Sequence, residues 1–291
     1  MKPAEFEYHA PTLAAAAVAL LAELGDTAKP IAGGQSLVPM LAMRLATFEH
    51  LVDLGRIAEL AGIARDGDAL RIGAGTTQAA IERSPEVAVD VPLLSRATPL
   101  IGHFQIRNRG TLGGSLAHAD PAAEYPAVAL ALDARFEVLS PGGARTVPAD
   151  EFFTGLFSTA IGDGELLTAV SFPVWTGRAG FGVREFARRH GDFAIAGAAV
   201  AVELDGDDRV ARSAISLFGM GGTPRRAAAA EHAARQTSLA QLDAVELGRL
   251  AVADLDDVPA DVHGSAEYRR RVGAAMVTAA WNDAIEEAAR A

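Results

Sequence analysis

The sequence contains no cysteine among its 291 residues. It therefore cannot form disulfides, provide a thiol nucleophile, or bind zinc or an iron–sulfur cluster through thiolates. Positive charge is also scarce, because 26 Lys and Arg residues face 37 Asp and Glu residues and leave a formal net charge of -11. No run of basic residues is present, so we expect no nonspecific binding to nucleic acid or to an anionic membrane surface.

Long hydrophobic runs are missing as well. The most apolar early stretch, residues 13–22, is well short of the roughly 20 residues that a membrane-spanning helix needs. Glu5 and Glu7 precede it, where a signal peptide would carry basic residues. From these features we expect a cytoplasmic protein without a membrane span.

The hydrophobic content, 50% of residues, is enough for a packed core, and the length predicts about two domains. Short strand patterns alternate with helical patterns up to residue 175. Three longer strand patterns then follow, at residues 181–186, 193–204 and 210–218, and a largely helical segment runs from residue 226 to the end. This order predicts an α+β protein with domains at residues 1–175 and 176–291.

Two glycine-rich segments carry the strongest chemical signal. Residues 32–36 lie between a predicted strand and a predicted helix, and residues 107–115 form a second, polar loop. Adjacent glycines let consecutive backbone N–H groups face one point, and such a nest binds an anion without a cationic side chain. Two nests can hold the two phosphates of a dinucleotide, with further donors from three hydroxyl residues, Ser36, Thr111 and Ser115. The alternative is that both segments are ordinary tight turns.

Other catalytic motifs are incomplete. The sequence has no G-x-x-x-x-G-K-[ST] motif, and residues 73–78 and 219–224 both fail the end of G-x-G-x-x-G. A hydrolase triad is disfavoured because no G-x-S-x-G elbow is present. The seven histidines lack H-x-x-x-H and H-E-x-x-H spacing, so no catalytic metal site is predicted.

Two charged positions remain open to different interpretations. Glu124 begins a predicted helix, where a carboxylate is favoured by the helix dipole, and it is equally suited to contact a ribose or hydroxyl group. Residues 188–193 are typical of a solvated hairpin end, although the same segment can border a site.

Five segments, in order, resemble the signatures of a known family. They are residues 30–40, 107–121, 165–167, 189–194 and 221–227. The sequence is similar to the flavoprotein, or medium, subunit of carbon monoxide dehydrogenase-type molybdenum hydroxylases, and to the flavin domain of xanthine dehydrogenase. The resemblance covers essentially the whole chain.

The resemblance implies a fold and a cofactor. The fold is a p-cresol methylhydroxylase-type FAD-binding region of two α/β subdomains, about residues 1–57 and 58–175, followed by a three-stranded antiparallel sheet with helices. The cofactor is non-covalent FAD, because Gln35 stands where some related flavoproteins have a His bonded to the flavin. The positions that match family contacts to FAD are Ile31, Ala32, Gly33, Gly34, Gln35, Ser36, Leu37, Val38, Ile101, Thr111, Leu112, Gly113, Gly114, Ser115, Glu124, Leu167, Arg184 and Phe193. At position 193 the family often has Tyr. Phe193 has no hydroxyl group, so any contribution of that hydroxyl is absent here.

The resemblance also implies a multisubunit complex. Because this chain has no cysteine, [2Fe-2S] clusters and the molybdenum cofactor are expected only on an iron–sulfur small subunit and a molybdenum large subunit. The expected assembly is a dimer of heterotrimers, cytoplasmic or held at the inner membrane face through the complex. FAD is expected to accept single electrons and pass them to a quinone, O₂ or another acceptor. No acid–base residue is assigned, and two alternatives stay open: a free-standing FAD-dependent oxidase or dehydrogenase, and a non-catalytic nucleotide-binding scaffold subunit.

Overall fold

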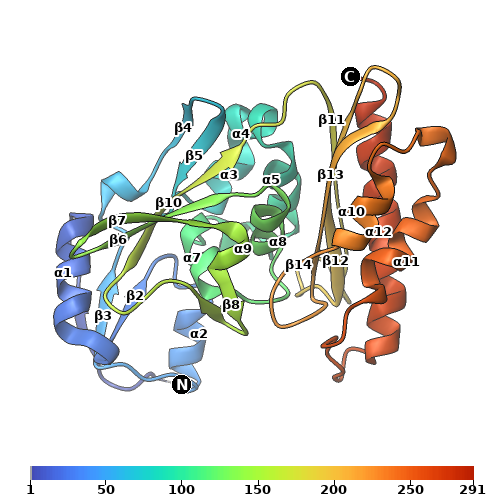
Figure 1. The fold of residues 1–291 in the computed structure, drawn as a ribbon. Coiled ribbons are helices and arrows are strands. Elements are labelled where there is room, and N and C mark those ends of the chain that lie inside the picture. Colours follow the sequence, from blue (N-terminus) through green and yellow to red (C-terminus); the bar gives the residue numbers. More distant parts are fainter. Residues whose placement is uncertain (1) are drawn as a thin grey trace.

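The computed structural model describes residues 2–291, and the chain begins with a small parallel sheet of order β1-β3-β2 (Figure 1). Helix α1 packs its buried face between this sheet and strands β6 and β10 of the next one. Pro30 is compatible with β2 because β2 is an edge strand, where a missing N–H leaves no ladder bond unmade. The elements of this part are β1 (Glu7–His9), α1 (Ala14–Leu24), β2 (Ala28–Ile31), α2 (Leu37–Ala42) and β3 (His50–Asp53).

The next part is built on a five-stranded antiparallel sheet of order β4-β5-β10-β6-β7, with short helices and a two-stranded hairpin around it. The long strands are β4 (Ile63–Asp66), β5 (Ala69–Gly73), β6 (Arg135–Ser140), β7 (Gly143–Pro148) and β10 (Leu166–Pro173), and the hairpin is β8 (Phe153–Gly155) with β9 (Ser158–Thr159). The helices are α3 (Gln78–Arg83), α4 (Pro85–Asp90), α5 (Pro92–Ala97), α6 (Phe104–Arg107), α7 (Leu112–His118), α8 (Glu124–Ala131) and α9 (Ala149–Phe152).

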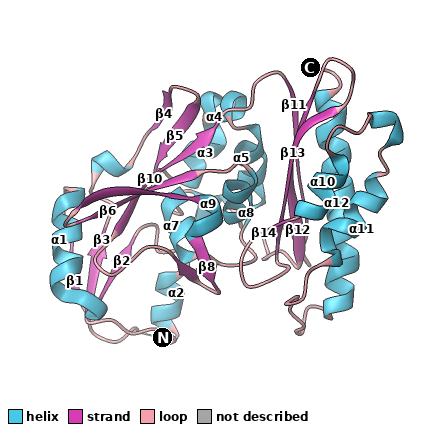
Figure 2. Cartoon of the chain, viewed as in Figure 1, coloured by secondary structure: helices cyan, strands magenta, loops and turns pink. Residues whose placement is uncertain are grey.

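The last part contains a second antiparallel sheet and three helices (Figure 2). Its strands are β11 (Arg178–Phe186), β12 (Ala196–Leu204), β13 (Val210–Phe218) and β14 (Arg225–Arg226), and its helices are α10 (Ala228–Ala234), α11 (Ala244–Ala253) and α12 (Ala266–Ala288). The three predicted strands are confirmed, and the two-residue strand β14 adds a fourth. The prediction that the second strand begins at residue 193 is wrong, because residues 193–195 belong to the preceding loop. Within residues 2–291, no helix combines the length and the apolar character needed to cross a bilayer.

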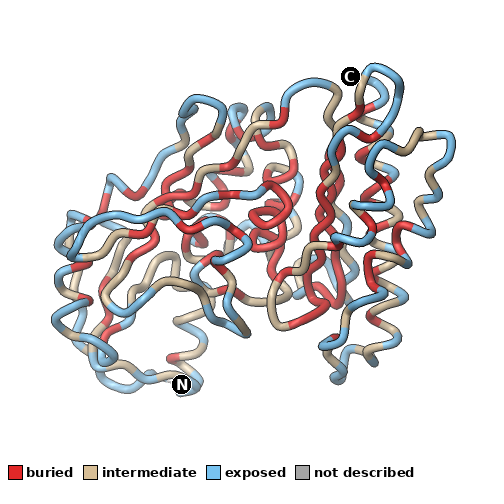
Figure 3. The backbone as a smooth tube through the Cα atoms, in the orientation of Figure 1, coloured by how far each residue is buried: buried red, intermediate tan, exposed pale blue. Residues whose placement is uncertain are grey.

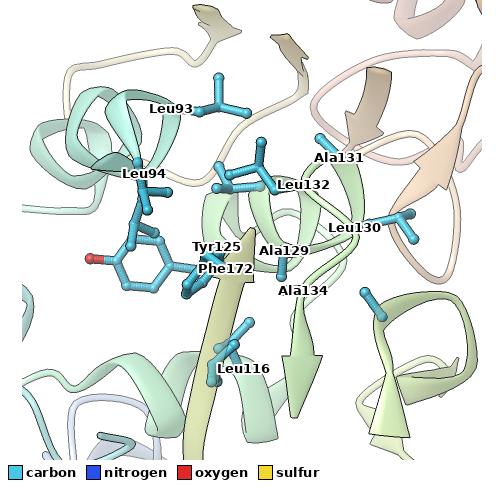
Figure 4. Packing of buried hydrophobic residues seen from close by; sticks show 14 of the residues in the cluster. Leu93, Leu94, Leu116, Tyr125, Ala129, Leu130, Ala131, Leu132, Ala134 and Phe172 are labelled. Atoms are coloured by element: carbon cyan, nitrogen blue, oxygen red, sulfur yellow. The ribbon is translucent and has the colours of Figure 1, made fainter. Parts of the chain in front are cut away.

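Helices cover both faces of the sheet β11–β14. Its central strand β12 is buried along almost its whole length (Figure 3). Alternate residues of this strand face opposite sides, as β geometry requires. Ala199 and Ala201 join the core formed with α5 and α8, whereas Val200 and Val202 join the core formed with α11 and α12. Figure 4 shows the first of these cores, in which Tyr125 of α8 and Leu94 of α5 pack above Phe172 of β10.

Helix α12 lies directly against β11 because two strand residues have no side chain. A Cβ atom on Gly180 would overlap the carbonyl oxygen of Ala284, and one on Gly182 would overlap that of Ala280. Backbone touches backbone at this contact, so nothing flexible can move aside. The two glycines therefore determine how closely the C-terminal helix approaches its sheet.

This contact gives a prediction on stability. Replacing Gly182 by Ala forces α12 away from β11, and we expect the free energy of unfolding to fall by about 1–3 kcal/mol. The matched control is Gly206→Ala in the exposed turn after β12, where a Cβ meets no atom within 4 Å. The control should change stability by less than about 0.5 kcal/mol. Chemical denaturation of both variants measures the difference, and equal stabilities would contradict the close packing.

Candidate functional site

The two glycine-rich segments lie against each other, although they are far apart in the sequence. The first, residues 32–36, connects β2 to α2. A Cβ atom on Gly33 would overlap the carbonyl oxygen of Arg109 and would lie 2.8 Å from the Cα atom of Gly110. A Cβ on Gly114 would lie 3.4 Å from the Cβ of Ala32. The convergence of the two segments is therefore as the sequence predicts, and it requires glycine at position 33.

In the part of the chain that the structure describes, the backbone N–H groups of residues 33–36 have no protein partner. None of them donates a hydrogen bond to an acceptor within residues 2–291. Gly34 has a φ angle of 72°, in the left-handed region, and such a turn in the backbone points successive N–H groups to one side. None of these four residues is buried, so a ligand can reach them. The side-chain amide of Gln35 donates to the carbonyl oxygen of Gly33 at 2.9 Å and so stabilises the loop from within.

The second segment is built differently from the prediction. Gly113 and Gly114 lie in the first turn of α7 rather than in a loop, and only Gly110 precedes the helix. The N–H of Leu112 donates to the carbonyl oxygen of Thr76 at 3.0 Å, and the N–H of Gly113 donates to that of Ala74 at 2.8 Å. The prediction of a second amide nest is therefore wrong, because residues 73–78 already accept these hydrogen bonds.

Some donors of the second segment do remain available. Thr111 caps α7 by accepting a hydrogen bond from the N–H of Gly114 at 3.0 Å on its side-chain oxygen. Within residues 2–291, the N–H of Thr111 and the hydroxyl groups of Ser36 and Ser115 have no hydrogen-bond partner. The second segment thus offers hydroxyl donors and one amide, while the first offers a row of amides. Together they form a donor-rich surface, and its row of amides at residues 33–36 has no cationic side chain among them.

A third segment approaches the loop that follows α5. A Cβ atom on Gly191 would lie 2.8 Å from Cε1 of His103 and 2.9 Å from the carbonyl oxygen of Gly102, so residues 188–193 pack against this loop. Beside this contact is a cavity of about 350 Å³. Its lining residues are Gly102, His103, Phe104, Gln105, Arg107 and His190. Phe193, at the end of the segment, exposes 68% of its surface.

Two glutamates influence each other electrostatically: Glu124 begins α8, and Glu185 lies near the end of β11. Glu124 is only 8% exposed and accepts no hydrogen bond from another residue within residues 2–291. Burial, with a further contribution from the nearby Glu185 carboxylate, raises the pKa of Glu124 to about 8. Burial also raises the pKa of Glu185 to about 7, and its Oε2 atom is buried without a hydrogen-bond partner. Near neutral pH, the Glu124 carboxyl is therefore predominantly protonated, and the Glu185 carboxyl is protonated in a substantial fraction of molecules.

Glu185 was not predicted, and its neighbour Arg184 was. Successive residues of a strand face opposite sides, and here Arg184 faces α12, where its guanidinium binds Asp283 at 2.6 and 2.8 Å. The structure therefore does not bring Arg184 to the glycine loops, and places Glu185 toward α8 instead. Side chains of β11 alternate between the two faces of the sheet. Glu185 can therefore be identified from the sequence only when it is known which face is directed toward Glu124. Leu167 lies in the hydrophobic core and is only 4% exposed, so its side chain is almost inaccessible.

The predicted contact residues differ in accessibility. Half-buried residues are Ile31, Ala32, Gly33, Gly34, Ser36, Leu37, Ile101, Gly114 and Ser115. Exposed residues are Gln35, Val38, Arg184 and Phe193. Buried residues are Thr111, Leu112, Gly113, Glu124 and Leu167. A ligand that lies over the two glycine segments can therefore reach most of the first segment directly, and mainly Gly114 and Ser115 of the second.

Comparison with known proteins identifies the two parts of the chain. Residues 4–175 match the family described as the FAD binding domain in molybdopterin dehydrogenase. Residues 182–284 match the CO dehydrogenase flavoprotein C-terminal domain. Both matches agree with the family that the five sequence segments resemble.

Individual relatives are similar over nearly their whole length. The 6-hydroxypseudooxynicotine dehydrogenase complex subunit alpha of Paenarthrobacter nicotinovorans is 44% identical, over 95% of this chain and 93% of that protein. A chain in the structure of carbon monoxide dehydrogenase from Hydrogenophaga pseudoflava superposes with a TM-score of 0.95 and 39% identity, covering 99% of both chains. A chain of quinoline 2-oxidoreductase from Pseudomonas putida 86 gives 0.92 and 34%, again over 99% of both.

These similarities confirm the predicted fold class and the predicted cofactor, FAD. They also agree with the arrangement of amides and hydroxyl groups at the two glycine segments, which suits a diphosphate. The chain therefore belongs to the family of FAD-binding medium subunits of molybdenum hydroxylases, whose carbon monoxide dehydrogenase members it matches from end to end.

Proposed function

We propose that FAD bound to this chain receives electrons from a partner iron–sulfur subunit. It passes them on to a terminal acceptor such as a quinone or O₂. The observation that supports this role most directly is the row of unpartnered N–H groups at residues 33–36. These donors bind a diphosphate without a cationic side chain, which suits a chain with a net charge of -11. The glycine at position 33 brings the second segment into contact, so a dinucleotide is held from two sides.

The other predicted residues have distinct proposed roles. The N–H of Thr111 and the hydroxyl of Ser115 donate to the cofactor from the α7 side. Ile101 and Phe193 provide apolar surface for the flavin ring, next to the cavity at His103. Bound FAD supplies the exchange of single electrons with a metal cluster and of electron pairs with an acceptor, and the protein holds and orients it. No residue of this chain is assigned an acid–base step.

The absence of cysteine supports an assembly with partners. An iron–sulfur cluster needs thiolate ligands, and this chain has none to offer. We therefore propose a small subunit with [2Fe-2S] clusters and a large subunit with the molybdenum cofactor, assembled as a dimer of heterotrimers in the cytoplasm or at the inner membrane face. The names of similar proteins, "medium chain" and "complex subunit alpha", favour this over a free-standing oxidase or a non-catalytic scaffold.

Substrate choice is proposed to lie outside this chain. Similar proteins belong to enzymes named for carbon monoxide, 6-hydroxypseudooxynicotine, caffeine and quinoline, which range from a diatomic gas to nitrogen heterocycles of different size and shape. A subunit that touched those substrates would need different pockets in each case, whereas this fold is preserved at TM-scores of 0.92 to 0.95. The substrate is therefore proposed to bind to the molybdenum subunit.

The division into domains at residues 1–175 and 176–291, with the first split near residue 57, is likewise a proposal. Residues 7–53 form the parallel sheet, and residues 63–173 form the antiparallel sheet. The sheet β11–β14 shares one core with α5 and α8. Arg96 of α5 also binds Glu287 of α12 at 2.6 and 2.7 Å. Because of these contacts we do not expect the last part to fold independently, and limited proteolysis of the whole chain tests the division.

The first prediction concerns FAD binding. A methyl group in Gly33→Ala overlaps the carbonyl oxygen of Arg109 and separates the two segments. We expect FAD affinity to fall at least about 10-fold, which corresponds to roughly 1.4 kcal/mol, while circular dichroism shows a folded chain. Gly206→Ala, in open space, is the matched control and should keep FAD. An FAD affinity in Gly33→Ala equal to that of the parent would refute the assignment. Changes at Gly113 are unsuitable for this test, because it packs against Ala74 in the interior.

A second prediction distinguishes the proposed role from its alternatives. The chain produced alone should bind FAD, show the visible absorbance of oxidised flavin, and lose that absorbance with dithionite. It should not be reduced by any substrate of the complex until the iron–sulfur and molybdenum subunits are added. Turnover by the chain alone would favour a free-standing oxidase or dehydrogenase, and a colourless chain that binds no flavin would favour a scaffold.

A third prediction concerns pH. In the folded, flavin-free chain the pKa of Glu124 is raised to about 8, so this carboxyl stays protonated while its unfolded counterpart ionises. This contribution to stability is fully present below the unfolded pKa and is lost as pH rises through the folded value. Glu124→Gln removes the effect, so the variant should gain stability relative to the parent between about pH 5 and 8.

Urea unfolding of both proteins at several pH values measures this difference. The matched control is Glu23→Gln on the exposed face of α1, which should follow the parent at every pH. A Glu124→Gln chain that loses stability relative to the parent as pH rises would show that the carboxylate is charged and stabilised in the folded state.

A further inference from the structure

Three potential metal ligands cluster at the edge of the parallel sheet, on the first strand and its neighbour. Glu7 and His9 belong to β1 and His50 belongs to β3, and Glu7 pairs directly with His50 in the parallel register. One ligand atom from each of the three side chains lies within 4.8 Å of the others. The two imidazole side chains are about 20% exposed, and the carboxylate is 67% exposed. The cluster is thus held by the sheet and open to solvent on one side.

The distances are compatible with a shared ion, and the two histidines also lie within hydrogen-bond distance of each other. Nε2 of His9 lies 3.1 Å from Nδ1 of His50. Two nitrogens bound to one zinc ion at about 2.0–2.1 Å lie roughly 3–3.5 Å apart in a tetrahedral geometry. The two carboxylate oxygens of Glu7 lie 3.9 Å from Nε2 of His9 and 3.5 Å from Nδ1 of His50. Both distances are too long for good hydrogen bonds. An ion between the three groups satisfies all of them at once.

We propose that Glu7, His9 and His50 form a binding site for a divalent transition metal, with Zn²⁺ as the best match. Two imidazole nitrogens and one carboxylate oxygen are a typical zinc ligand set. Mg²⁺ and Ca²⁺ prefer sites made of oxygen ligands, so they are disfavoured. The exposed side of the cluster leaves the fourth coordination position to water.

The ion joins β1 to β3. Strand β1 has only three residues and lies at the sheet edge, where few hydrogen bonds hold it. Tyr8, between the two β1 ligands, donates a hydrogen bond to Asp53, which pairs in register with Ile31 just before the first glycine segment. A metal that holds β1 in place therefore also holds Asp53 of β3 and, through it, the end of β2 at Ile31. The amide row of residues 33–36 follows directly after this end.

Sequence spacing does not reveal this site. The two histidines are 41 positions apart, so no local metal-binding motif exists, and only the parallel pairing of β1 with β3 brings them together. The sequence-based expectation of no metal site rested on the absence of H-x-x-x-H and H-E-x-x-H motifs. Both motifs place their histidines on a single helix, so they do not detect ligands on two paired strands.

The test is zinc binding by the full chain, without a polyhistidine tag and after removal of metals with EDTA. Isothermal titration calorimetry with ZnCl₂ should give one site per chain, and MgCl₂ at the same concentration should give none. Zinc should also raise the midpoint of thermal unfolding in a concentration-dependent way, because the ion binds the folded chain. Absence of a stoichiometric zinc site in the parent chain would overturn the proposal.

Variants identify the ligands. Even an outer-shell partner of a metal ligand is worth about 10–100-fold in affinity, so His9→Gln and His50→Gln should each weaken zinc binding at least ~10-fold. The matched control is His232→Gln on the exposed surface of α10, which should bind zinc as the parent does. In EDTA all variants should unfold at the parent temperature. If a histidine variant is unstable without metal, the exposed Glu7→Gln replaces it. Parent affinity in the ligand variants would refute the site.

Discussion

The close backbone contact between Gly33 and the pair Arg109–Gly110 is the constraint on which the proposed cofactor site depends. No side chain fits between these two backbone segments. Only glycine at position 33 therefore allows the β2–α2 loop to contact the segment that leads into α7. The contact sets the spacing of the donor groups on its two sides. A rigid scaffold supports it, because the sheets on either side hold β2 and α7 in place.

The two sides of this contact have different tasks. Residues 33–36 present free N–H groups, whereas the first amides of α7 are already bound by the carbonyl oxygens of Ala74 and Thr76. The glycines of α7 therefore allow close packing in the interior, and hydroxyl groups provide most of the remaining donors. An acidic chain can bind a dinucleotide in this way, because hydrogen bonds and not cations meet the phosphate charge. Burial raises the pKa of Glu124 to about 8 and that of Glu185 to about 7, which reduces the negative charge that these two carboxyl groups carry near neutral pH.

Much of this arrangement can be predicted from the sequence, and the failures have physical causes. Paired glycines between a strand and a helix indicate an anion-binding turn, and five ordered segments indicate the family. The fate of the Gly113 amide depends on which carbonyl group lies opposite, and that is determined by tertiary packing against residues 73–78. Arg184 was expected because it matches a contact position of the family, and the sequence does not show that this residue faces Asp283 of α12. His9 and His50 come together only through strand pairing.

Hydrogen exchange at individual amides tests the central claim most directly, by comparing the flavin-free chain with the chain saturated with FAD. The amides of residues 33–36 should exchange rapidly without FAD, because no group within residues 2–291 accepts their hydrogen bonds, and should slow markedly when FAD is bound. The amides of Leu112 and Gly113 should be protected in both states. Continued rapid exchange at residues 33–36 in the FAD-saturated chain would contradict the account.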